Sequence, residues 1–123
     1  MELKKPDYTA RWVFPFPDEP ETGVQMRKLT DAEVNRIYDR NKYVPGSKGA
    51  TVSKASAVLN EMICASVQDW KGFTQDGVAL ECTDTNKILM LEQPMVGEDG
   101  ERTSVWAVIN EKFAKLQEAD LKN

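Results

Sequence analysis

The sequence predicts a mainly α-helical fold within the α+β class, with about four helices and a short N-terminal β-hairpin or extended arm. Its 123 residues suffice for one domain. Apolar residues recur at helical spacing in several separate segments. Prolines and aromatic residues crowd the N-terminal segment and bias it towards extended backbone. We therefore expect a single domain over 1–123, with an extended aromatic and proline-rich arm at 1–23 and a helical body at 24–123.

The N-terminal arm contains the first extended segment. Pro15, Pro17 and Pro20 fix their own φ angles and lack a backbone N–H, so they exclude a central strand. After the arm, apolar side chains at positions 24, 26 and 29 give a strand-like pattern. We expect segments 11–16 and 24–29 to pair as a hairpin with a long loop.

A capping box predicts the start of the first helix. Thr30 is followed three residues later by Glu33, so that the threonine oxygen accepts a backbone N–H and the glutamate reaches back. Apolar residues then follow at i, i+3, i+4 spacing: Val34, Ile37 and Tyr38. The helix is expected to run to about residues 41–42, and a loop is expected at 45–49.

The second helix is predicted from Val52 to Trp70. Its apolar positions form a continuous helical stripe of Ala55, Leu59, Met62, Ile63, Val67 and Trp70. We expect Gly72 to end this helix, because glycine tolerates the left-handed backbone of a helix C-terminus.

A turn and a short helix are predicted next. Asp76 and Gly77 are typical of a tight turn, here inside a small hairpin or an irregular loop. Thr83 is expected to cap a short helix over 85–92, which Pro94 ends.

The final helix is predicted over 103–119, after an acidic loop at 97–101, with Thr103 or Ser104 as its cap. Its apolar residues have two interpretations: a core stripe, or a face that docks in the groove of a partner. The acidic loop before the helix and the polar tail after it make this end the better candidate for partner contact. The candidate partner residues are Trp106, Ile109, Phe113 and Leu116.

Aromatic residues in the arm pose a similar choice. Trp12, Phe14 and Phe16 lie within a few residues of one another, beside the prolines. Such a segment either packs on the chain's own helices or docks on a neighbouring subunit. Self-packing is favoured because scattered apolar residues usually complete a core, and the three aromatics are also candidate partner residues.

The composition argues against an enzyme. The chain has no histidine, which removes catalytic triads with a histidine base and histidine metal sites. Cys64 and Cys82 are too few for a four-cysteine zinc site and are expected to be reduced, buried thiols. Asp69, Asp76 and Asp84 have structural roles at a helix end, a turn and a cap. We therefore predict no catalytic residue, no cofactor and no metal site.

The charge distribution argues against nucleic acid as a partner. The formal net charge is −4, and the second half is the acidic one: residues 61–123 carry 6 Lys/Arg and 12 Asp/Glu, against 10 and 8 in residues 1–60. An acidic half disfavours phosphate binding, and the basic residues of the first half are too dilute for a nucleic-acid patch. No apolar run is long enough to span a membrane, so no membrane partner is expected either.

Four short motifs follow one another in the chain. Residues 24–33 run from a strand pattern into the first capped helix, and residues 67–73 contain Trp-Lys-Gly. Residues 76–77 are Asp-Gly, and residues 81–87 contain Thr-Asp-Thr-Asn. Over about residues 24–123 this arrangement resembles the tail assembly chaperones of long-tailed bacteriophages and prophages. The motif residues are Thr30, Glu33, Trp70, Gly72, Asp76, Gly77, Thr83 and Asn86.

The resemblance implies a non-enzymatic chaperone that binds the tape measure protein and helps the tail tube assemble. The implied partners are the tape measure protein and the tail tube protein, and the implied location is the host bacterial cytoplasm. One long client favours several chaperone copies along it, so a homo-oligomer is compatible with the role. The alternative is a structural tail completion or connector protein that is retained in the virion.

Overall fold

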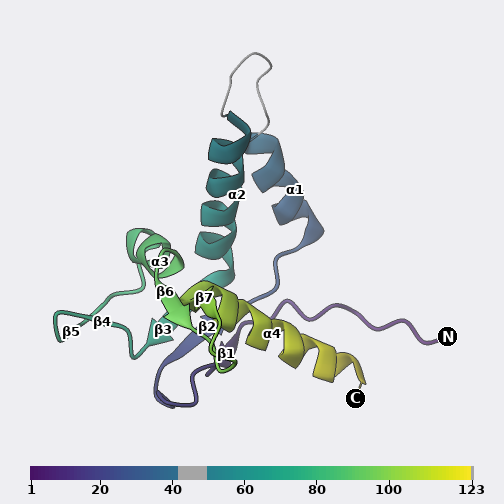
Figure 1. Ribbon diagram of the computed structural model, residues 1–123. Coiled ribbons are helices and arrows are strands. Elements are labelled where there is room, and N and C mark those ends of the chain that lie inside the picture. Colours follow the sequence, from purple (N-terminus) through teal and green to yellow (C-terminus); the bar gives the residue numbers. More distant parts are fainter. Residues whose placement is uncertain (42–49, 123) are drawn as a thin grey trace.

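The computed structural model describes residues 1–41 and 50–122, with side chains at 1–41 and 55–119. Four helices and seven strands are present in these residues (Figure 1). The strands form one three-stranded and two two-stranded antiparallel sheets. The fold is an α+β mixture, and the prediction of a mainly α-helical fold is wrong. Most of the missed strands have two or three residues, which is too short for an alternating pattern to stand out in sequence.

The three-stranded sheet lies at the centre of the fold, in the order β1-β2-β3. Its strands are β1 (Arg11–Val13), β2 (Gly23–Met26) and β3 (Val67–Lys71). Val13 lies opposite Val24, which confirms the predicted N-terminal hairpin over shorter strands. Because side chains alternate between the faces of a sheet, one face is buried and the other carries more polar residues. The buried face contributes Val13, Val24, Met26, Val67 and Trp70.

Helix α1 (Asp31–Arg40) begins at the predicted capping box. The backbone N–H of Glu33 donates to Thr30 Oγ1 at 3.1 Å, and the backbone N–H of Thr30 donates to Glu33 Oε1 at 3.1 Å. Asn41 follows the last helical residue as its C-cap, in agreement with the predicted end. The predicted loop at 45–49 lies outside the described residues.

Helix α2 (Ala50–Ser66) ends earlier than the sequence predicts, and β3 follows it without a loop. The prediction that Val67 and Trp70 continue the helix is wrong. Trp70 lies opposite Val24 of β2, and Val67 lies opposite Met26 across a register shift. Pairing with β2 satisfies the backbone of residues 67–71 as a strand, and both apolar side chains remain buried.

Polar side chains, rather than Gly72, provide hydrogen bonds to backbone carbonyls at the C-terminus of α2. Ser66 Oγ donates to the carbonyl oxygen of Met62 at 2.8 Å, and Gln68 Nε2 donates to that of Ala65 at 2.9 Å. The Ala65 carbonyl is one of the last-turn carbonyls that have no partner inside the helix, and the Ser66 hydroxyl bonds back to the carbonyl four residues earlier. Gly72 instead forms the turn after β3 with a φ of 88°.

Strands β4 (Thr74–Gln75) and β5 (Val78–Ala79) form a small hairpin whose two-residue loop is Asp76-Gly77. The φ angles of Asp76 and Gly77 are 50° and 79°, as a type I′ turn requires, so the predicted turn is confirmed. Helix α3 (Asp84–Leu91) then begins at its predicted cap, where Asn86 N–H donates to Thr83 Oγ1 at 3.2 Å.

The acidic loop at 97–101 joins two strands that the sequence analysis did not predict, β6 (Pro94–Val96) and β7 (Arg102–Ser104). Helix α4 (Val105–Lys122) follows directly. Of the two candidate caps, Ser104 is the one used: its Oγ accepts from the N–H of Ala107 at 3.1 Å.

The helices lie in two groups around the central sheet (Figure 1). Helices α1 and α2 pack together and extend away from the sheet, whereas α4 lies beside it, near both chain ends. The main core forms where α2, α3 and α4 meet the buried face of the sheet. Its buried members are Val13, Phe16, Val24, Met26, Ile63, Val67, Trp70, Met90, Ile109 and Phe113.

Candidate partner-binding surfaces

The predicted partner residues of α4 divide between the core and the surface. Ile109 is 0 % exposed and Phe113 is 7 % exposed, and both belong to the core of the single chain. Trp106 and Leu116 are half-buried and pack against that core. Binding of a partner through α4 remains a prediction. Among the four residues, Trp106 and Leu116 leave the most apolar surface accessible, and Phe113 leaves only a small part.

The three aromatics of the arm lie on opposite faces of the central sheet. Phe16 is buried in the core together with Val13, which confirms self-packing for this part of the arm. Trp12 and Phe14 lie on the other face, where their rings stack with centroids 6.1 Å apart. The Lys71 ammonium lies 4.9 Å from the Trp12 centroid and 5.0 Å from that of Phe14, within cation–π range.

Gly23 makes this aromatic cluster possible. Gly23 of β2 lies opposite Lys71 of β3 and next to the ring of Phe14. A Cβ at this position would lie 2.6 Å from Phe14 Cε1, so any side chain would displace the ring. The missing side chain lets groups from β1 and β3 meet across the middle strand.

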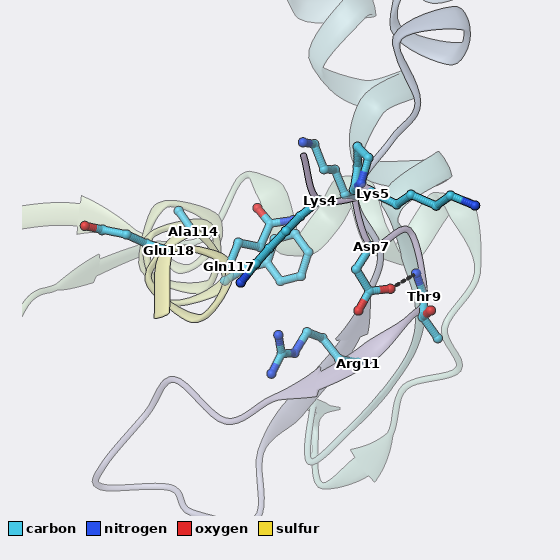
Figure 2. A pocket seen from close by; sticks show the side chains of 11 residues that line it. Lys4, Lys5, Asp7, Thr9, Arg11, Ala114, Gln117 and Glu118 are labelled. Carbon is cyan, nitrogen blue, oxygen red and sulfur yellow. Dashed lines mark hydrogen bonds between the residues drawn. The ribbon is translucent and has the colours of Figure 1, made fainter. Parts of the chain in front are cut away.

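A groove lies between the N-terminal segment and α4 (Figure 2). Its volume is about 440 Å³, which falls within the range of ligand-binding clefts. Phe113, Ala114 and Gln117 line it from the helix, and Thr9 and Pro6 line it from the facing segment. Of the predicted partner residues on α4, only Phe113 lines the groove, and none of the predicted aromatics of the arm does.

Charged side chains line the same groove. The cations are Lys4, Lys5, Arg11 and Lys28, and the carboxylates are Asp7 and Glu118. The local balance is thus positive in a chain whose formal net charge is −4. Asp7 Oδ1 accepts from the backbone N–H of Thr9 at 2.8 Å (Figure 2). Hydrogen bonds from Thr9, with a smaller contribution from Arg11, lower the pKa of the Asp7 carboxyl.

This concentration of positive charge is not evident from the sequence alone. The four cations are spread over residues 4–28, and the α4 residues that line the same groove lie at positions 113–118. The predicted strand at 11–16 was the available signal, because alternation places Arg11 and Val13 on the same face. Val13 is buried beneath α4, so Arg11 lies at the edge of that packing.

A second hollow of about 610 Å³ lies between the β6–β7 hairpin, α4 and residues 15–18. Its charged lining mixes both signs: Asp18, Glu98, Asp99, Glu101 and Glu111 against Arg102, Lys112 and Lys115. Lys115 Nζ already pairs with Glu111 Oε1 at 3.1 Å. Because positive charge does not predominate in its lining, this hollow offers an acidic partner less electrostatic selectivity than the groove does.

Two residues of the sequence motifs, Trp70 and Asn86, make hydrogen bonds that stabilise the structure around them. Trp70 Nε1 donates to the carbonyl oxygen of Leu80 at 2.9 Å, which ties β3 to the segment before α3. Asn86 Nδ2 donates to the carbonyl oxygen of Glu81 at 2.9 Å, which fixes the entry to the same helix. A buried lysine completes this region: Lys87 Nζ donates to the carbonyl oxygen of Cys64 at 3.1 Å.

The two thiols, Cys64 and Cys82, are free and half-buried. Burial is the largest cause that raises the pKa of both thiols, and Lys87 partly opposes it. A raised pKa keeps both groups protonated near neutral pH and therefore poorly nucleophilic.

Glu33 of the first capping box also forms an ion pair. Arg27 Nη1 donates to Glu33 Oε1 at 2.8 Å, and Arg27 Nη2 donates to Glu33 Oε2 at 2.6 Å, a bidentate arrangement. The hydrogen bonds from Arg27, followed by that from the Thr30 backbone, lower the pKa of Glu33 from 4.5 to about 2. The carboxylate thus holds the start of α1 against the strand that precedes it.

This ion pair predicts an acid-labile contribution to stability. A pKa lower in the folded chain than in the unfolded chain stabilises the fold above pH 4.5, and the stabilisation is lost as pH falls towards about 2. The thermal midpoint of the wild type should therefore fall more steeply over this range than that of Glu33→Gln. Calorimetry at several pH values measures both slopes. Equal slopes would show that the Glu33 pKa is not lowered by folding.

Comparison of the chain with protein-family models, curated proteins and solved structures finds no significant match. Among the residues that the structure describes, no helix is both long enough and apolar enough to cross a membrane. In the same part of the chain, no three histidine, cysteine or acidic side chains are grouped so that they could hold a metal ion.

Proposed function

We propose that this protein is a non-enzymatic assembly chaperone of a bacteriophage or prophage tail, which binds the tape measure protein in the host bacterial cytoplasm. The proposal combines the family resemblance of residues 24–123 with one observation of geometry. That observation is the groove between the N-terminal segment and α4, whose lining combines an apolar part, Phe113 and Ala114 (the groove floor), with a predominance of positive charge.

The groove suits client binding for two physical reasons. Phe113, which is 7 % exposed, and the exposed Ala114 line the groove, so an apolar client side chain can contact both and lose part of its exposure to water. Its rim lysines carry long flexible side chains, which adapt to clients of different sequence. A holdase needs both properties, because it must shield apolar client surface and release it again during assembly.

Co-expression with the tape measure protein tests the proposal. We expect the tape measure protein to be more soluble with this chain than without it, and to co-purify with it. Purified tail particles should lack the chain. A client that stays insoluble and unbound would contradict the proposal. Recovery of the chain in stoichiometric amounts from purified particles would instead favour a structural tail completion or connector protein.

A further inference from the structure

We propose that the groove between the N-terminal segment and α4 binds an acidic segment of the client that places a large apolar side chain on the groove floor. This inference rests on the proposed function and specifies the chemistry of the client segment. It depends on charge complementarity, since Lys4, Lys5, Arg11 and Lys28 line the groove against only Asp7 and Glu118.

The positions of these charges favour a peptide. Lys4 and Lys5 belong to the N-terminal segment, which faces α4 across the groove (Figure 2). A client carboxylate entering between the walls would meet an ammonium group, while an apolar side chain beside it would reach Phe113 and Ala114. The volume of about 440 Å³ accommodates a few side chains and leaves no room for a whole folded domain.

The same lining disfavours nucleic acid. A phosphate backbone carries negative charge at every nucleotide, and Asp7 and Glu118 would repel part of it. A peptide can place its few carboxylates against the lysines and present neutral or apolar groups to the two acidic residues.

Ala114 gives a matched pair of variants for the test. It is exposed on α4 and lines the groove, so neither Ala114→Glu nor Ala114→Gln should disturb the core. The two variants have nearly the same size and differ in charge. Circular dichroism and thermal midpoints should be the same for both variants, so a difference in binding reports charge in the groove.

The test measures the affinity of the chain for a labelled synthetic peptide of alternating leucine and glutamate blocks. Fluorescence anisotropy reports binding at low and at moderate salt. We expect Ala114→Glu to bind this probe about tenfold more weakly than Ala114→Gln, which keeps the size of the new side chain but not its charge. Binding should weaken as salt rises. The corresponding leucine–lysine peptide should bind at least about tenfold more weakly than the glutamate peptide.

Several outcomes would overturn the inference. They are equal affinity of Ala114→Glu and Ala114→Gln, preference for the lysine peptide, and tighter binding of a single-stranded oligonucleotide than of the glutamate peptide. Self-association that Ala114→Glu abolishes would make a second copy of the chain the occupant and would also overturn it. If the tape measure protein is solubilised while the glutamate peptide does not bind, the chaperone proposal stands and only the acidic-segment inference fails.

Discussion

Replacing Gly72 with alanine should lower the free energy of unfolding by about 3 kcal/mol. Gly72 has a φ of 88°, a backbone conformation that disfavours any residue with a Cβ. The added Cβ would also lie 2.7 Å from the Cα of Thr22, and backbone cannot move aside as a flexible side chain does. Two independent penalties therefore act at one position, where the turn after β3 meets the residue before β2.

Gly77→Ala is the matched control for this prediction. Gly77 has a similar φ of 79°, but no atom lies within 4 Å of an added Cβ. Only the backbone strain remains, and the expected loss is about 1 kcal/mol. Urea denaturation of both variants measures the difference. Equal losses would mean that the close approach of Gly72 to Thr22 is absent in solution.

Replacing Ile109 with alanine should lower the free energy of unfolding by about 3 kcal/mol, because it leaves a cavity in the core. Ile109 is 0 % exposed on the inner face of α4, where it packs with the sheet residues and Phe113. The matched control is Val96→Ala, whose side chain is 62 % exposed, and its expected effect is within about 0.5 kcal/mol.

The comparison of Ile109→Ala with Val96→Ala also determines which α4 variants are suitable for testing partner binding. If Ile109→Ala is as mild as Val96→Ala, α4 does not pack as described, and its apolar face is free for a partner. If Ile109→Ala is strongly destabilising, core variants of α4 lose client binding simply because they unfold. Surface positions such as Ala114 are then the appropriate sites for testing partner contact.

The local features of the fold could be predicted from sequence because their hydrogen bonds join neighbouring residues. The capping box of Thr30 and Glu33 and the cap at Thr83 each depend on a side chain and a backbone group three residues apart. The Asp76-Gly77 turn depends on two residues that tolerate positive φ. Such features need no information about distant parts of the chain.

The features that depend on distant residues were missed. Residues 67–71 continue a helical apolar stripe in sequence, but they form a strand because β2, some forty positions earlier, presents a free edge to them. Tertiary pairing overrides the local pattern here. The groove is missed for the same reason, since its walls come from residues 4–28 and 113–118 and meet only when β1 packs beside α4.

The predicted partner residues of the arm also depend on long-range packing that the sequence does not show. Sequence alone could not separate core from surface among the aromatics of the arm, because Phe14 and Phe16 both follow prolines or precede them. In the structure Phe16 is buried and Phe14 is 43 % exposed. Both residues follow the end of β1, so strand alternation does not relate them, and tertiary packing determines which one is buried.

The most direct test of the proposed function is co-purification of the tape measure protein with the wild type, with Ala114→Gln and with Ala114→Glu. We expect the wild type to retain the client, Ala114→Gln to retain clearly more of it than Ala114→Glu, and Ala114→Glu to lose most of it although it remains folded. Client that co-purifies with none of the three, while all three are folded and soluble, would contradict the chaperone function. Client retained equally by all three would contradict the groove as its binding site.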